Sequence, residues 1–134
     1  MVELVWNSER SATVLTSSGA LAEVGTPGAF VPEDLVCMAA AGCLMRTFLS
    51  LADEISLSIL SYASTARMQS AAGVSRPHIT VNIYIAVPTG VDPSVVHRLC
   101  RTCEDESGIA RLLGSRLVVM CDVRVVCGTA AVVH

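Results

Sequence analysis

The chain has 134 residues, of which 52% are hydrophobic and 16% are charged, and its formal net charge is -3. A weakly acidic chain offers no basic face to a phosphate backbone, so nucleic acid is excluded as a partner. All nine basic residues are arginine, which excludes lysine Schiff-base chemistry and the phosphate-binding lysine of a P-loop.

The length predicts a single domain over residues 1–134, built around one core. The charged share is below the roughly 25% that is usual in soluble domains, so one copy has too little polar surface to cover itself. We therefore expect a stable homodimer. The six cysteines are too small a share for a disulfide scaffold. Residues 1–6 lack the basic start and cleavage site of a signal peptide, so a cytoplasmic location is expected.

The first half of the chain predicts three short strands and a long helix. The strands are expected at residues 3–7, 12–16 and 20–24, where β-type runs are separated by turn residues. Pro32 suits the first turn of a helix that extends to residues 55–58. Its section 35–52 is apolar on nearly every side, which predicts a central position in the fold. Arg46 interrupts this section, which is shorter than the roughly 20 apolar residues of a bilayer span, so no membrane contact is expected.

Beyond the helix, the hydrophobic pattern changes from helical to alternating. Residues 60–68 and 79–87 predict the two strands of a hairpin, with its loop at residues 71–77. Asp92 and Pro93 then predict the start of a second helix, which residues 107–108 interrupt. A last strand is expected at residues 117–126. The order βββ-α-ββ-α-β predicts an α+β fold.

Two cysteines lie on the predicted helices: Cys43 on the apolar one and Cys103 on the buried stripe of the second. A cysteine reacts as its thiolate, which a nearby cation stabilises. Arg46, one turn beyond Cys43, and Arg10, near the N-terminal strands, are the candidate cations, and Glu33 is a candidate to orient either of them. Ten helical residues span about 15 Å, so Glu33 reaches Cys43 only if the first turn bends back or a second subunit supplies it.

The remaining cysteines have simpler interpretations. Cys121 and Cys127 are expected in the core, on the inner face of the last strand. Cys100 and Cys103 form a Cys-x-x-Cys pair, but it lies late in a helix, whereas redox motifs of this kind open one. Cys121 and Cys127 have the wrong spacing to complete a zinc site, so no metal is expected.

A Pro-Glu-Asp-Leu sequence at residues 32–35 and an Ala-Ala-Gly-Cys sequence at residues 40–43 are followed by a helix that carries Cys103 and a closing strand. These features resemble the OsmC/Ohr family of thiol-dependent hydroperoxide reductases. In that family a Pro-Glu pair precedes the first cysteine by ten residues, and the second cysteine follows about sixty residues later, as Glu33, Cys43 and Cys103 do here. The resemblance implies an OsmC-like intertwined α+β homodimer with a long central helix and sites at the interface.

The resemblance also implies roles for individual residues. Cys43 would attack an organic hydroperoxide and become a sulfenic acid, and Cys103 would resolve it as a disulfide. Glu33 would hold the activating arginine, for which Arg10 is the N-terminal candidate. The implied activity is that of a peroxidase of the oxidative stress response, which takes its electrons from a dithiol reductant and needs no cofactor.

The chain departs from the family pattern directly after Cys103. Family members usually have Cys-Pro there, whereas this chain has the acids Glu104, Asp105 and Glu106. Three carboxylates next to a thiol should raise its pKa and slow its attack. This departure favours an alternative in which the protein is a non-catalytic dimer of the same fold, which binds a small apolar ligand or has a structural role.

Overall fold

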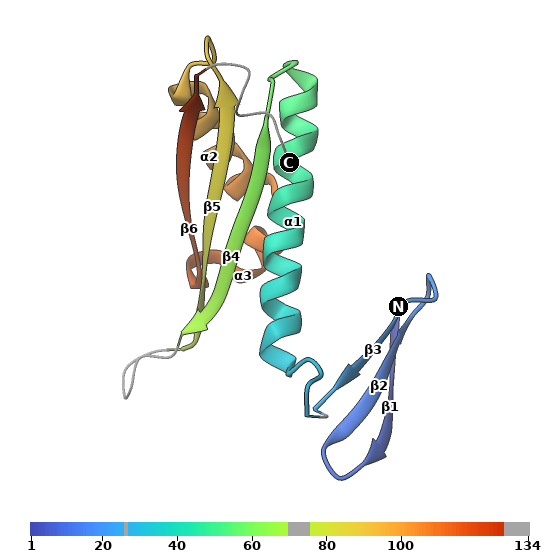
Figure 1. Cartoon of the computed structure of the whole chain (residues 1–134). Helices are drawn as coiled ribbons and strands as arrows, with labels where there is room; N and C mark the ends of the chain where they lie inside the picture. The colour runs from blue at the N-terminus through green and yellow to red at the C-terminus, as the bar shows by residue number, and fades with distance from the viewer. Residues whose placement is uncertain (26, 70–75, 128–134) are drawn as a thin grey trace. The chain divides into compact units, whose positions relative to one another are not determined.

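The computed structural model describes residues 1–25, 27–69 and 76–127. Its elements are β1 (Val2–Ser8), β2 (Ser11–Thr16), β3 (Leu21–Val24), α1 (Pro32–Glu54), β4 (Ser61–Gln69), β5 (His78–Pro88), α2 (Pro93–Glu106), α3 (Gly108–Leu113), a 3-10 turn (Gly114–Arg116) and β6 (Leu117–Val126) (Figure 1). The predicted α+β class and the order βββ-α-ββ-α-β are confirmed, with α3 as a short helix after the predicted interruption. The chain divides into two compact units, residues 1–36 and the residues from 37 onward.

The first unit is an antiparallel sheet in the order β1-β2-β3. Val14 on the central strand lies opposite Leu4 on one side and Ala22 on the other, and the register of β1 against β2 shifts between Trp6 and Ser8. Among its described residues only Ala12 and Val24 are buried. A three-stranded sheet with so little buried apolar surface is not stable alone, so its apolar side chains need a further surface to cover them.

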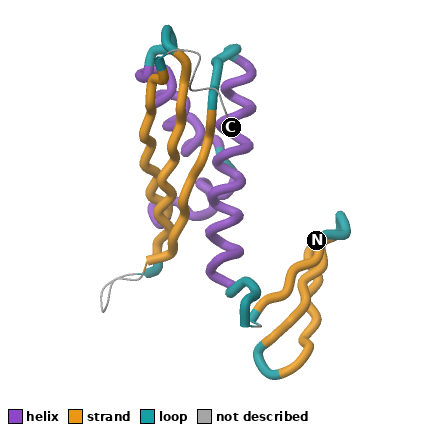
Figure 2. The backbone as a smooth tube through the Cα atoms, viewed as in Figure 1, coloured by secondary structure: helices purple, strands orange, loops and turns teal. Residues whose placement is uncertain are grey.

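The second unit contains a sheet in the order β4-β5-β6. β4 and β5 pair antiparallel, whereas β5 and β6 pair parallel. A parallel pair needs a crossover connection, which α2 and α3 provide. The helices lie on one face of this sheet (Figure 2), and the side chains of β5 that are buried alternate along the strand: Ile79, Val81, Ile83, Ile85 and Val87. The predicted hairpin loop falls mostly outside the described residues.

Helix α1 supplies a large part of the core of the second unit. Ala40, Leu44, Phe48 and Ala52 follow one another at intervals of four residues, so they share one face of the helix, and all four are buried. The Phe48 ring packs against that of Tyr62 on β4, with 5.5 Å between the ring centroids. This confirms α1 as a long helix with a buried face.

Helix α1 ends at Glu54, slightly before the predicted end at residues 55–58, and extends beyond the apolar section 35–52 on both sides. It has 23 residues with a mean hydropathy of 1.8, which makes it long and apolar enough to cross a membrane by length and composition. One face of the helix lies in the protein core, but only 22% of this apolar stretch is buried, so a position central enough to cover nearly every side is not found within the described residues of one copy. On other sides it exposes large apolar residues, including Met38, Met45 and Leu49.

The second helix begins as its sequence predicts. Asp92 is the N-cap of α2, and its carboxylate oxygen Oδ1 accepts a hydrogen bond of 2.9 Å from the backbone N–H of Ser94. The four buried residues of α2 are Val96, Leu99, Cys100 and Cys103. The inward position predicted for Cys103 is therefore confirmed.

Candidate active site

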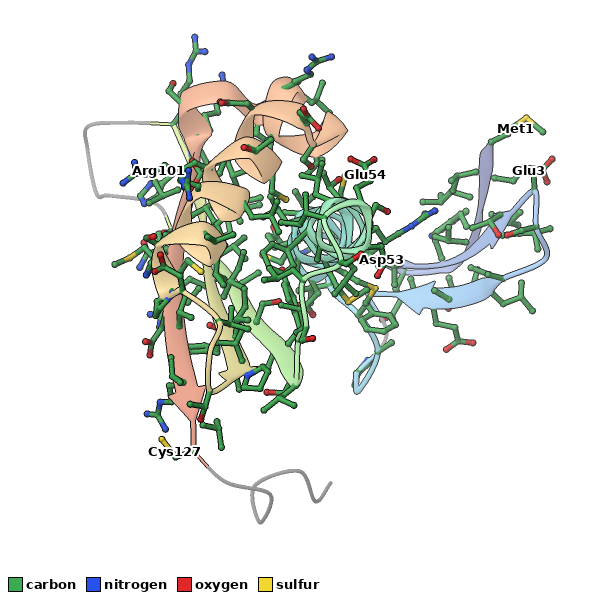
Figure 3. All side chains as sticks on the ribbon, turned by 90° about the horizontal axis from the view of Figure 1, so that it is seen from above. Met1, Glu3, Asp53, Glu54, Arg101 and Cys127 are labelled. Atoms are coloured by element: carbon green, nitrogen blue, oxygen red, sulfur yellow. The ribbon has the colours of Figure 1, made fainter. Side chains whose placement is uncertain are left out.

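Cys43 lies on α1 at the wall of an open cleft of about 660 Å³. Its side chain is half-buried, so the sulfur is accessible from the cleft. The cleft is formed by successive turns of α1 and by the end of α2, where Glu106 lies; Glu54, at the end of α1, is labelled in Figure 3. The cleft is lined by Met38, Ala39, Gly42, Cys43, Arg46, Thr47, Ser50, Leu51, Glu54 and Glu106.

Ser107 connects α2 to α3 and directs a hydroxyl at Cys43. It is fully buried, and its backbone N–H donates a hydrogen bond of 2.9 Å to the carbonyl of Cys103. Its Oγ donates to Sγ of Cys43 over 3.1 Å. Because Ser107 makes no side-chain capping bond to α3, its hydroxyl is available to the thiol.

These donors lower the pKa of Cys43. The largest cause is the hydrogen bond from the Ser107 hydroxyl, followed by a backbone hydrogen bond from Ile109 at the start of α3, with a smaller one from Gly108. Partial burial opposes them, and the charge of Arg46 is the smallest contribution. The lowered pKa of Cys43 agrees with the expectation from the sequence. The cause of the lowering differs, because the hydroxyl and backbone donors contribute more than the arginine that the sequence indicated.

Cys103 lies close to the same site in a very different environment. Only 1% of its surface is exposed, and its thiol donates a hydrogen bond of 3.1 Å to the carbonyl of Leu44, the residue after Cys43. Burial raises the pKa of Cys103 to about 12, with further contributions from the charges of Cys43 and Glu104. Of the three acids after Cys103, Glu104 and Glu106 raise its pKa as expected, although burial is the larger cause. At neutral pH Cys103 is a protonated thiol.

Arg10 and Glu33 belong to the first unit, whereas Cys43 and Cys103 belong to the second. Arg10 is exposed in the turn between β1 and β2, and Glu33 is exposed in the first turn of α1. Their association with Cys43 stays a prediction. Arg46, the other arginine considered, lines the cleft together with Cys43.

Sequence reasoning missed Ser107 as a partner of Cys43. The sequence marks residues 107–108 as an interruption of the second helix, but 64 residues separate Ser107 from Cys43, and no local pattern connects them. The described residues include no group of three or more His, Cys, Asp or Glu side chains that could hold a metal ion.

A second pair of cysteines lies between α2 and β6. The Sγ atom of Cys100 donates to Sγ of Cys121 over 2.9 Å. Cys121 is half-buried and packs against the core, as predicted. The same prediction is wrong for Cys127, which is exposed because β6 ends at Val126, one residue before it (Figure 3).

The sequence model of the family described as OsmC-like protein matches residues 25–121. No curated protein sequence matches the chain. Among solved structures, an OsmC-like protein from Mycoplasma pneumoniae is similar with a TM-score of 0.74 and 14% identity, over 94% of this chain and 96% of that one.

Two further similar structures are named for organic hydroperoxide resistance. The OsmC protein from Legionella pneumophila has a TM-score of 0.70 and 16% identity, over 92% of this chain and 95% of that one. OhrB of Bacillus subtilis has a TM-score of 0.66 and 12% identity, over 92% and 98%. At these identities the likeness establishes the fold alone. The family match, however, spans the Pro-Glu sequence, Cys43 and Cys103, and the chain belongs to the OsmC-like family.

Proposed function

We propose that the protein is a thiol-dependent peroxidase that reduces organic hydroperoxides at Cys43. The observation that carries this proposal is the hydrogen bond from the buried Ser107 hydroxyl to Cys43, whose pKa is lowered while its sulfur borders an open cleft. A reactive cysteine needs both a stabilised thiolate and access. The structural neighbours named for organic hydroperoxide resistance support this substrate class.

The first step is attack of the Cys43 thiolate on the peroxide. The sulfur forms a bond to one oxygen of ROOH as the O–O bond breaks, and the departing alkoxide takes up a proton to give the alcohol. Cys43 is left as a sulfenic acid. Met38 and Leu51 offer apolar walls for the organic group, and Arg46 offers positive charge for the departing oxygen.

The second step is resolution by Cys103. Its sulfur attacks the sulfenic sulfur, the Cys43–Cys103 disulfide forms, and hydroxide leaves and takes up a proton as water. Cys103 must first lose the proton that it donates to the Leu44 carbonyl, and its pKa of about 12 makes the thiolate scarce at neutral pH. Resolution is therefore slower than the first step and accelerates as the pH rises. A dithiol reductant then reduces the disulfide.

The working form is a cytoplasmic homodimer in which residues 1–134 act as one domain. The first unit buries too little apolar surface to stand alone, and Met38, Met45 and Leu49 leave an apolar side of α1 uncovered. A second copy of the chain supplies the missing cover and brings Glu33 and Arg10 to Cys43. Light scattering at micromolar concentration tests this assembly, and a folded species of 14.1 kDa would contradict it.

Consumption of cumene hydroperoxide in the presence of dithiothreitol tests the activity. Cys43→Ser should abolish consumption with the fold intact by circular dichroism. Cys103→Ser should allow a first turnover and then accumulate oxidised Cys43. The matched control is Cys127→Ser, because Cys127 is exposed at the end of β6. Equal consumption by wild type and Cys43→Ser would overturn the proposal.

The raised pKa of Cys103 favours the second candidate function, a non-catalytic dimer that holds a small apolar ligand in the cleft. In that case wild type does not consume hydroperoxide, both thiols remain open to alkylation after peroxide treatment, and no peptide links Cys43 to Cys103. Protection of Cys43 from alkylation by an apolar ligand would then support this alternative.

A further inference from the structure

A contact between two thiols, Cys100 and Cys121, is not used in the proposed reaction. Cys100 on α2 and Cys121 on β6 have sulfurs 2.9 Å apart. A disulfide bond measures about 2.05 Å, so these atoms need to approach by only about 0.9 Å. Cys100 is 3% exposed, whereas Cys121 is half-buried on β6, whose only described partner strand is β5. Cys100 is therefore the buried residue of the pair, and Cys121 is the partly exposed one.

This pair is adjacent to the thiols of the candidate active site. Cys100 and Cys103 lie one helical turn apart on the buried face of α2. Charge on Cys103 contributes to the raised pKa of Cys100. Burial raises the pKa of Tyr62 on β4, and charge on Cys103, Cys100 and Cys121 raises it further. Cys103 contacts α1 at the Leu44 carbonyl, next to Cys43, and Cys100 contacts Cys121 on β6, so the four cysteines extend from α1 across α2 to β6.

We propose that Cys100 and Cys121 are a second redox-active dithiol. It reduces the Cys43–Cys103 disulfide by thiol–disulfide exchange and itself becomes a disulfide. This inference rests on the proposed function, since that disulfide is the oxidant. Cys100 attacks Sγ of Cys103, the Cys43–Cys103 bond breaks, and Cys43 leaves as a thiolate. Cys121 then attacks Sγ of Cys100, and Cys103 leaves and is protonated. Two electrons pass from the second pair to the first, and no other reactant is consumed.

Local hydrogen bonding supports both exchange steps. The bond from Cys100 lowers the pKa of Cys121, while the same bond and burial raise the pKa of Cys100. Cys121 can therefore accept the proton of Cys100 across their contact as Cys100 attacks. The lowered pKa of Cys43 makes it a good leaving group.

The exchange places hydroperoxide reduction and the reaction with the dithiol reductant at different cysteines. Cys43 returns to its thiolate form in the cleft and is ready for another hydroperoxide, while the disulfide resides between α2 and β6. The reductant then attacks Cys121, the less buried residue of the second pair. One chain can hold two disulfides.

Trypsin digestion distinguishes the two disulfides, because the chain contains arginine but no lysine. Cys100 falls on peptide 99–101, Cys103 on 102–111 and Cys121 on 117–124, each as the one cysteine of its peptide. Cys43 falls on peptide 11–46 together with Cys37, and fragmentation of this peptide assigns the linked cysteine. The reduced protein is treated with one equivalent of cumene hydroperoxide, quenched with acid at increasing times, alkylated and digested. The link between 11–46 and 102–111 should form first and then give way to the link between 99–101 and 117–124. A second equivalent should produce both.

Cys121→Ser should form the first link but never the second. Cys127→Ser should behave as wild type, because Cys127 is exposed outside the pair. The proposal is overturned if the first link forms and persists while Cys100 and Cys121 alkylate fully. Treatment of Cys43→Ser with diamide, a thiol oxidant that needs no peroxidatic cysteine, separates this result from failure of the proposed function. If hydroperoxide gives no link in wild type while diamide gives the 99–101 to 117–124 link in Cys43→Ser, the peroxidase reaction is refuted. That result still shows that Cys100 and Cys121 form a disulfide with another oxidant. If diamide gives none either, the dithiol is refuted.

Discussion

Replacing Ser107 by alanine tests the origin of the reactivity of Cys43. The substitution removes the hydroxyl that donates to Cys43 over 3.1 Å and leaves the backbone donors of α3 in place. Hydrogen bonds to charged groups contribute about 1.5–3 kcal/mol. Because Cys43 is half-buried and water competes for its thiolate, the lower end of this range applies. A loss of about 1.4 kcal/mol reduces the thiolate fraction at neutral pH about tenfold.

The assay is the rate of alkylation of Cys43 by iodoacetamide as a function of pH, followed by mass spectrometry on peptide 11–46, where fragmentation separates Cys43 from Cys37 on the same peptide. Ser107→Ala should move the profile to higher pH and slow alkylation at neutral pH about tenfold. Ser50→Ala is the matched control, because Ser50 lines the same cleft but is not among the groups that shift the pKa of Cys43. Coincident profiles for Ser107→Ala and wild type would refute the assignment of the hydroxyl as the main cause.

Three further predictions concern stability. Burial raises the pKa of Cys103 from 9.0 to about 12, so its contribution to the free energy of unfolding is complete below pH 9 and is lost by about 1.4 kcal/mol per pH unit between 9 and 12. Urea unfolding at pH 8, 9 and 10 should show this decline, and Cys103→Ala should make it shallower; equal slopes would contradict the assignment. Phe48→Ala should cost about 3–5 kcal/mol in the same assay, because the ring is fully buried, and a cost below about 1 kcal/mol would contradict the packing of α1. Gly25→Ala should lower the melting temperature more than Gly19→Ala: both glycines have positive φ, but only at Gly25 does an added Cβ meet the Arg10 carbonyl, so equal effects would contradict this turn geometry.

Local sequence signals predicted the elements of this fold well. Asp92 followed by Pro93 specifies the start of α2 because an N-cap and a first-turn proline act within one helical turn. Likewise, the strict alternation in β5 reflects a strand with one buried face, and the observed strand His78–Pro88 contains the predicted one. The parallel pairing of β5 with β6 depends instead on how α2 and α3 cross over, which no local pattern records.

The candidate site was only partly predictable for the same reason. The helical spacing correctly indicated that Arg46 shares the cleft with Cys43. The stronger stabilisation comes from Ser107 and α3, more than sixty residues along the chain, and becomes visible only in three dimensions. The contact between Cys100 and Cys121 joins a helix to a strand 21 residues further along the chain. The local Cys-x-x-Cys spacing pairs Cys100 with Cys103 instead, so it does not predict this contact.

The position of Ser107 makes the chemistry of Cys43 conditional on the completed chain. During synthesis α1 emerges long before residues 107–109, so Cys43 is at first an ordinary cysteine without its hydroxyl and backbone donors. Its thiolate is stabilised only after α2 has folded back and the start of α3 has reached α1. An unfinished or unfolded chain is thereby protected from oxidation at Cys43, and fast alkylation of this one thiol reports that the native structure has formed.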